Sequence, residues 1–128
     1  MNILKQTVCI ISLCLLISAN KSETGSFKSQ TNAKFAKTIA RKGVQIVDCR
    51  KDVEFASGHI PKAIHIDFLK EDFKEKSLSL LDKSRPVAIY CLRGGRSKDA
   101  GKILAENGYT VFELDKGIAE WNGKLEKQ

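Results

Sequence analysis

The chain has 128 residues, a formal net charge of +7 and 29% charged residues. This length suits one compact core and not two. Basic residues alternate with acidic ones, as in 70–76 (KEDFKEK), and no basic cluster is interleaved with aromatic residues, so we expect no nucleic-acid partner. The modest positive excess still favours small anions as ligands.

Residues 1–22 have the pattern of a signal peptide. Lys5 gives a positive start, and residues 8–17 (VCIISLCLLI) form an apolar run too short to cross a membrane comfortably. Small residues at 18–20 offer cleavage sites, and the bond after Ala19 is our first choice. We therefore expect an exported protein, periplasmic or secreted, with no membrane anchor after cleavage. An uncleaved N-terminal anchor or a buried strand is the alternative.

The four cysteines fall into two pairs by position. Cys9 and Cys14 lie in the predicted signal peptide and leave with it, and Leu13 before Cys14 makes a poor lipoprotein site. Cys49 and Cys91 stay in the exported domain. In an oxidising compartment they either form one disulfide or keep a reactive thiol.

Residues 23–30 are polar, and we expect a loose lead-in there to a domain that takes up 31–128. Within the domain, short β-rich apolar runs alternate with helical patterns. Strands are predicted at 44–48, 63–66, 87–90 and 110–114, and helices from 31 or 32 to 43, at 52–57, after an Asp67 cap, at 97–107 and from 117.

This alternation predicts an α/β fold with a mostly parallel central sheet and helices on both faces. In such sheets the reactive site lies beyond the carboxyl ends of the strands. Three predicted strands end at 48–50, at Asp67 and at the loop that begins with Cys91. The site is therefore expected among these segments.

The loop at 91–97 (CLRGGRS) joins a buried strand to a helix start. Its two glycines let successive backbone N–H groups turn inward as an anion-binding nest, and the helix N-terminus adds further N–H groups. A thiol at the centre of that ring is expected to have a depressed pKa, and Arg93 and Arg96 add positive charge. Two other interpretations remain: Cys91 as a small buried hydrophobe, and an anion-binding loop without catalysis.

Three segments resemble the hallmarks of rhodanese domains. The loop 91–97 is similar to the active-site loop C-x-x-G-x-R-S of single-domain members, 48–66 (DCRKDVEFASGHIPKAIHI) resembles D-x-R-x-x-x-E-F-x-x-G-H-I-P-G-A, and 117–121 (GIAEW) resembles the closing G-G-x-x-x-W segment. Departures are Lys62 in place of a Gly, Cys49 where Val is more common, and Lys116 where the first closing Gly often stands.

These patterns assign a role to each candidate residue. Cys91 is the catalytic residue, and Asp48, Arg50 and His59 are expected to support the site structurally, with His59 fixing a turn. Neither His59 nor His65 pairs with a cysteine at metal-ligand spacing, so we expect no metal and no cofactor. The residues expected to bind the substrate are Leu92, Arg93, Gly94, Gly95, Arg96 and Ser97.

The resemblance implies a thiosulfate sulfurtransferase. The Cys91 thiolate takes the outer sulfur of a small anionic donor such as thiosulfate, forms a persulfide and passes the sulfur to cyanide or a thiol. We expect a monomer, with a protein sulfur partner possible. A persulfide carrier with little turnover on small donors is the main alternative.

Two further classes stay open. A phosphatase or arsenate reductase would use C-x5-R, whereas Arg96 closes this loop after four residues. A redox protein would use Cys49 and Cys91 as a reversible disulfide pair, which requires Cα atoms within about 7 Å.

Overall fold

The computed structural model describes residues 24–128. Five strands form one sheet in the order β1-β5-β4-β2-β3, and every pair of neighbours is parallel. This confirms the predicted α/β fold. The strands are β1 (Ser26–Gln30), β2 (Gln45–Asp48), β3 (Ile64–His65), β4 (Val87–Tyr90) and β5 (Thr110–Leu114).

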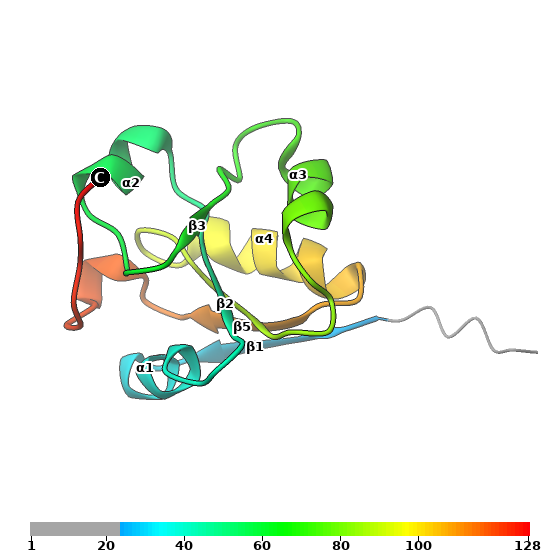
Figure 1. Cartoon of the computed structure of the whole chain (residues 1–128), viewed down its shortest axis with the longest axis horizontal. Helices are drawn as coiled ribbons and strands as arrows, with labels where there is room; N and C mark the ends of the chain where they lie inside the picture. The colour runs from blue at the N-terminus through cyan, green and yellow to red at the C-terminus, as the bar shows by residue number, and fades with distance from the viewer. Residues whose placement is uncertain (1–23) are drawn as a thin grey trace, which may run out of the picture.

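Helices cover both faces of the sheet. Figure 1 shows α1 on one side and α3 and α4 on the other, with α2 beyond the carboxyl ends of the strands. No helix within residues 24–128 is long and apolar enough to cross a membrane. The helices are α1 (Asn32–Ile39), α2 (Asp52–Ser57), α3 (Phe73–Leu80), α4 (Gly95–Glu106) and the short 3-10 helix η2 (Ile118–Glu120).

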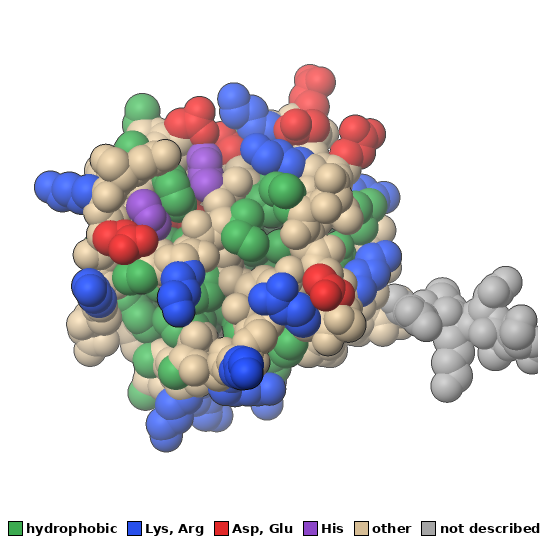
Figure 2. Space-filling model, in the orientation of Figure 1, with side chains coloured by type: hydrophobic (Ala, Val, Ile, Leu, Met, Phe, Trp, Pro, Cys, Tyr) green, Lys and Arg blue, Asp and Glu red, His purple; other side chains and the backbone are tan. Residues whose placement is uncertain are grey.

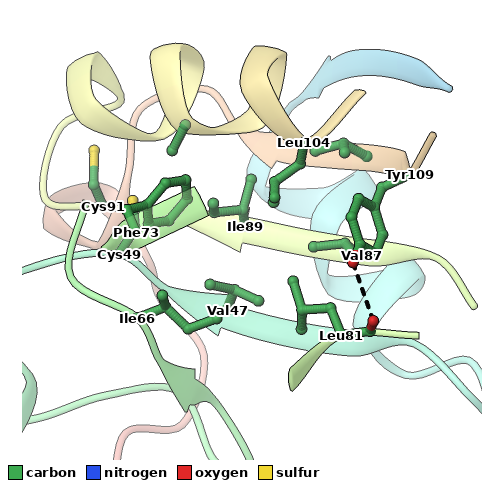
Figure 3. Packing of buried hydrophobic residues seen from close by; sticks show 12 residues of the cluster. Val47, Cys49, Ile66, Phe73, Leu81, Val87, Ile89, Cys91, Leu104 and Tyr109 are labelled. Atoms are coloured by element: carbon green, nitrogen blue, oxygen red, sulfur yellow. Dashed lines mark hydrogen bonds between the residues drawn. The ribbon is translucent and has the colours of Figure 1, made fainter. Parts of the chain in front are cut away.

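Two hydrophobic clusters lie on the two faces, which explains why the central strands β2 and β4 are buried along their whole length. The cluster under α3 and α4 is drawn in Figure 3 and includes both cysteines of the domain. The cluster on the α1 side comprises Phe35, Ile46, Ile60, Ala88, Tyr90, Leu114 and Ile118.

The expected loose lead-in at 23–30 is wrong, because it contains the edge strand β1. Ser26 to Gln30 pair in parallel with Thr110 to Leu114 of β5. Phe27 packs so closely on α4 that a Cβ at Gly101 would lie 2.6 Å from its ring. The strand is mostly exposed, so its polar sequence lacks the apolar alternation that would have predicted it.

Two helix limits also differ from the prediction. The helix after β3 starts at Phe73, so Asp67 is not its cap; Asp67 Oδ1 instead accepts the Leu69 N–H at 2.9 Å and closes a turn. Thr31 does cap α1, but that helix ends at Ile39, before Gly43. The signal peptide expected at 1–22 lies outside the described residues.

Candidate active site

Cys91 follows the last residue of β4 and begins a tight loop into α4. Gly94 has a left-handed φ of +99°, and a Cβ there would lie 2.1 Å from the Asp115 carbonyl oxygen, so the loop closes only with glycine. The helix then starts at Gly95, two residues earlier than predicted. Ser97 therefore lies in the first turn of α4, and its N–H donates to Cys91 Sγ.

Three polar groups of the loop lie against Cys91 Sγ. The backbone N–H of Gly94 donates at 3.1 Å, the N–H of Ser97 donates at 3.3 Å, and Ser97 Oγ lies 3.3 Å away. A hydrogen bond from the Cys49 side chain, followed by those from Ser97 and Gly94, lowers the pKa of Cys91 to about 4 against the opposing effect of burial. Cys91 is therefore a thiolate at neutral pH.

Cys49 stands directly beside Cys91 in the core. Figure 3 shows the two side chains together at one end of the cluster, next to Phe73. The pKa of Cys49 is raised well above its ordinary value, first by the hydrogen bond to Cys91, then by burial and by the charge on Cys91. Cys49 thus stays a thiol while Cys91 is ionised, and both are free cysteines in this structure.

A buried carboxylate supports the loop from behind. Glu113 of β5 is 0% exposed and accepts from Ser97 Oγ at 2.6 Å and from Ser29 Oγ at 2.5 Å. Lys98 Nζ lies 3.3 Å from the same carboxylate. Because the Ser97 hydroxyl has one proton, it donates either to Glu113 or to the Cys91 thiolate. Glu113 therefore fixes the first turn of α4 and competes for the hydroxyl proton.

The two loop arginines have different surroundings. Arg96 forms a two-pronged ion pair with Glu54 of α2, with N–O distances of 2.7 and 3.0 Å. This pair lowers the pKa of Glu54 and raises that of Arg96. Arg93 is exposed, and no acidic partner lies within 4.0 Å of it among residues 24–128. Arg93 therefore offers an uncompensated positive charge beside the loop.

The segment after β2 is held by its own ion pair. The Arg50 guanidinium donates to both carboxylate oxygens of Asp48, at 2.7 Å for the shortest contact, and to the Gly58 carbonyl at 2.6 Å. His59 Nδ1 lies 2.9 Å from the Phe55 carbonyl oxygen. Figure 2 shows the two histidines near each other on one face, where both rings stack on Phe55. These contacts lie away from Cys91 Sγ and fit structural roles.

The structure thus brings together some predicted site residues and adds others. Gly94 and Ser97 contact the sulfur, while Leu92 uses its carbonyl to accept the Ala119 N–H at 2.9 Å. Glu54 lies in the segment 48–66 that resembles a rhodanese hallmark, but the sequence predicted no role for it. Glu113 was missed, although one acidic residue inside the apolar run TVFEL was a signal.

Nothing in the described region points to a metal. Residues 24–128 contain no group of three or more His, Cys, Asp or Glu side chains that could hold an ion.

A sheet of this order with a thiolate in a Gly-rich loop defines a rhodanese-type site. Residues 31–124 match the family model for the rhodanese-like domain, and the chain belongs to that family. It is 34% identical over 88 residues to the putative sulfurtransferase YtwF of Bacillus subtilis, covering 69% of this chain and 82% of that protein.

Two further comparisons agree. The chain is 32% identical over 98 residues to thiosulfate sulfurtransferase GlpE of Shewanella oneidensis, covering 76% of this chain and 94% of that protein. The crystal structure of a rhodanese-like domain protein from Staphylococcus aureus superposes with a TM-score of 0.69 at 32% identity, covering 79% of this chain and 98% of that one. Rhodanese-like sulfurtransferases are therefore its class.

Proposed function

We propose that this protein is a thiosulfate sulfurtransferase that works through a persulfide on Cys91. The observation that carries the proposal is the set of N–H donors on Sγ, from Gly94 at 3.1 Å and Ser97 at 3.3 Å. They stabilise a sulfur anion with dipoles that are already in place before the reaction. The relatives named above support the same donor class.

In the first half-reaction the Cys91 thiolate attacks the outer sulfur of thiosulfate. A bond forms between Sγ and that sulfur, the S–S bond of thiosulfate breaks, and sulfite leaves with the electron pair. In the second half-reaction cyanide or a thiolate attacks the outer sulfur of the persulfide and returns Cys91 as a thiolate. No general base is needed, because a pKa of about 4 leaves Cys91 already ionised.

Sulfur transfer fits this loop better than phosphate chemistry. Arg96 closes the loop after four residues, and its guanidinium donates to both carboxylate oxygens of Glu54. The N–H groups approach the sulfur itself, which suits a compact persulfide anion more than a tetrahedral phosphoryl group.

Intact mass spectrometry tests the proposal directly. In full-length protein carrying Cys9→Ser, Cys14→Ser and Cys49→Ser, so that Cys91 is the one remaining thiol, incubation with thiosulfate should add one sulfur atom, and adding cyanide should remove it as thiocyanate. Cys91→Ser should show no mass gain and should lower thiocyanate formation about a thousandfold or more. Phosphate release from an aryl phosphate, with no thiocyanate, would overturn the proposal.

A further inference from the structure

Cys49 and Cys91 occupy opposing positions on neighbouring parallel strands. The last pair of β2 and β4 is Asp48 with Tyr90, and the hydrogen-bonded ladder runs one step further because the Cys49 N–H donates to the Tyr90 carbonyl at 3.0 Å. Gln45 makes the same contact to Pro86, the residue before its partner Val87. The register therefore places Cys49 opposite Cys91.

This placement meets the requirements of a disulfide. Neighbouring strands lie about 4.7–4.9 Å apart, and disulfides join Cα atoms about 4.4–6.8 Å apart. Side chains alternate between the two faces, and both cysteines belong to the cluster under α3 and α4, so their Cβ atoms leave the sheet on the same side. The register and the shared face of the sheet therefore favour a disulfide between these two cysteines over any pairing with a more distant residue.

The two sides of Cys91 Sγ are occupied differently. The Gly94 and Ser97 N–H groups donate to Sγ from the loop that leads into α4, whereas Cys49 stands opposite Cys91 at the end of the neighbouring strand β2. A sulfur carried by Cys91 and held by the loop N–H groups would leave the β2 side of Sγ facing the Cys49 thiol. A thiol–disulfide exchange needs a thiol with access to Sγ, and Cys49 is the thiol that the register places there.

Building on the persulfide function above, we propose that Cys49 is a resolving thiol that releases the sulfur of Cys91 as hydrosulfide. Cys49 attacks Cys91 Sγ, the bond between Sγ and the outer sulfur breaks, and the proton of Cys49 leaves on that sulfur. The products are hydrosulfide and a Cys49–Cys91 disulfide, so the outer sulfur is reduced and Cys49 is oxidised, while Cys91 keeps the oxidation level that it reached in the persulfide. A low-molecular-weight thiol or a dithiol protein then reduces the disulfide.

Loading of Cys91 changes the surroundings of Cys49 in the required direction. While Cys91 is a thiolate, the hydrogen bond with it and its negative charge hold the pKa of Cys49 high. In the persulfide the negative charge moves to the outer sulfur, further from Cys49. Cys49 therefore stays inactive beside the empty thiolate and becomes easier to ionise once sulfur has been loaded.

The first experiment does not depend on thiosulfate. Full-length protein with Cys9→Ser and Cys14→Ser is treated with one equivalent of methyl methanethiosulfonate, a small reagent that places a methylthio group on the reactive thiolate. We expect Cys49 to displace methanethiol and form a Cys49–Cys91 disulfide. The chain should then be two hydrogen atoms lighter than the untreated protein, and digestion should release the Cys49 and Cys91 peptides joined by that disulfide. Cys49→Ser and the apolar Cys49→Val should both keep the methylthio group on Cys91.

A second experiment uses thiosulfate and follows hydrosulfide without any added thiol. Hydrosulfide should appear about tenfold faster or more from the protein with Cys49 than from Cys49→Ser, because the attack is intramolecular. Wild-type protein that keeps the methylthio group, or that remains a dithiol, overturns the role of Cys49. Failure of thiosulfate to load Cys91 in Cys49→Ser overturns the proposed function instead, and the methylthio experiment still decides the role of Cys49.

Discussion

The cysteines that directly follow β2 and β4 have pKa values shifted in opposite directions. Cys49 and Cys91 are opposed on neighbouring strands, and their exposed fractions are 0% and 1%. Yet the pKa of Cys91 is lowered to about 4 and that of Cys49 is raised. Burial therefore does not decide which thiol ionises.

The difference comes from the backbone after each cysteine. After Cys91 the chain turns through Gly94 into α4 and sends N–H groups back to the sulfur. After Cys49 the chain continues into Arg50, whose N–H donates at 2.9 Å to Asp48 and not to a sulfur. Donors aimed at one sulfur, with none aimed at the other, divide the pair into a thiolate and a thiol.

The largest expected effect comes from replacing Gly94, the left-handed residue of the loop between β4 and α4. Gly94→Ala puts a side chain in a left-handed conformation and 2.1 Å from the Asp115 carbonyl oxygen. We expect a loss of about 2–4 kcal/mol in the free energy of unfolding and about a hundredfold in sulfur transfer, since the N–H groups move off Sγ. Denaturant melts and thiocyanate assays measure both.

Gly95→Ala is the matched control for that variant. A Cβ at Gly95 meets nothing within 4 Å, and the residue starts a helix. It should keep its activity and change the free energy of unfolding by no more than about 1 kcal/mol. Equal damage from both substitutions would mean that the loop does not depend on the left-handed turn at Gly94.

The next effect is on the pH dependence of Cys91. The thiolate reacts, so alkylation by iodoacetamide should fall as pH drops through about 4 and stay level above pH about 6. Cys49→Val removes the largest cause of the lowered pKa, and we expect the midpoint to rise by about one to two pH units. An unchanged midpoint would show that the loop donors alone set the ionisation.

A smaller effect, on the KM for thiosulfate, distinguishes the three arginines of the segments that follow β2 and β4. Arg50 is paired with Asp48 and Arg96 with Glu54, whereas Arg93 is exposed beside the loop. Arg93→Ala should therefore raise the KM for thiosulfate about threefold to tenfold with kcat little changed, because a distant charge attracts the dianion uniformly. Arg96→Ala should change KM less and cost about 1 kcal/mol of stability. A larger rise in KM from Arg96→Ala than from Arg93→Ala would mean that Arg96, and not Arg93, binds the sulfur donor.

Much of this site was readable from the sequence because it is local. The loop 91–97 carries its glycines, its thiol and its helix start within seven consecutive residues, and the apolar runs at 44–48 and 87–90 predict the two central strands. What stayed hidden depends on pairing across the chain. β1 is polar and exists only against β5, and the opposition of Cys49 and Cys91 follows from a register that no single segment contains.

The smallest expected effect concerns the left-handed position in the segment that follows β2. The loop after β4 uses glycine there, but this segment uses Lys62, with φ of +70° in the turn after Pro61. A left-handed residue with a Cβ costs about 1–2 kcal/mol relative to glycine, part of which glycine loses again as chain entropy in the unfolded state. Lys62→Gly should therefore raise the free energy of unfolding by about 0.5–1 kcal/mol.

Sulfur transfer should be unchanged in Lys62→Gly, because none of the groups that contact Cys91 Sγ lies in that turn. Lys62→Ala keeps the Cβ and removes only the charged chain, so it separates backbone strain from the loss of a lysine. If Lys62→Ala stabilises as much as Lys62→Gly, the gain comes from the charge, and the left-handed backbone at this position is not strained.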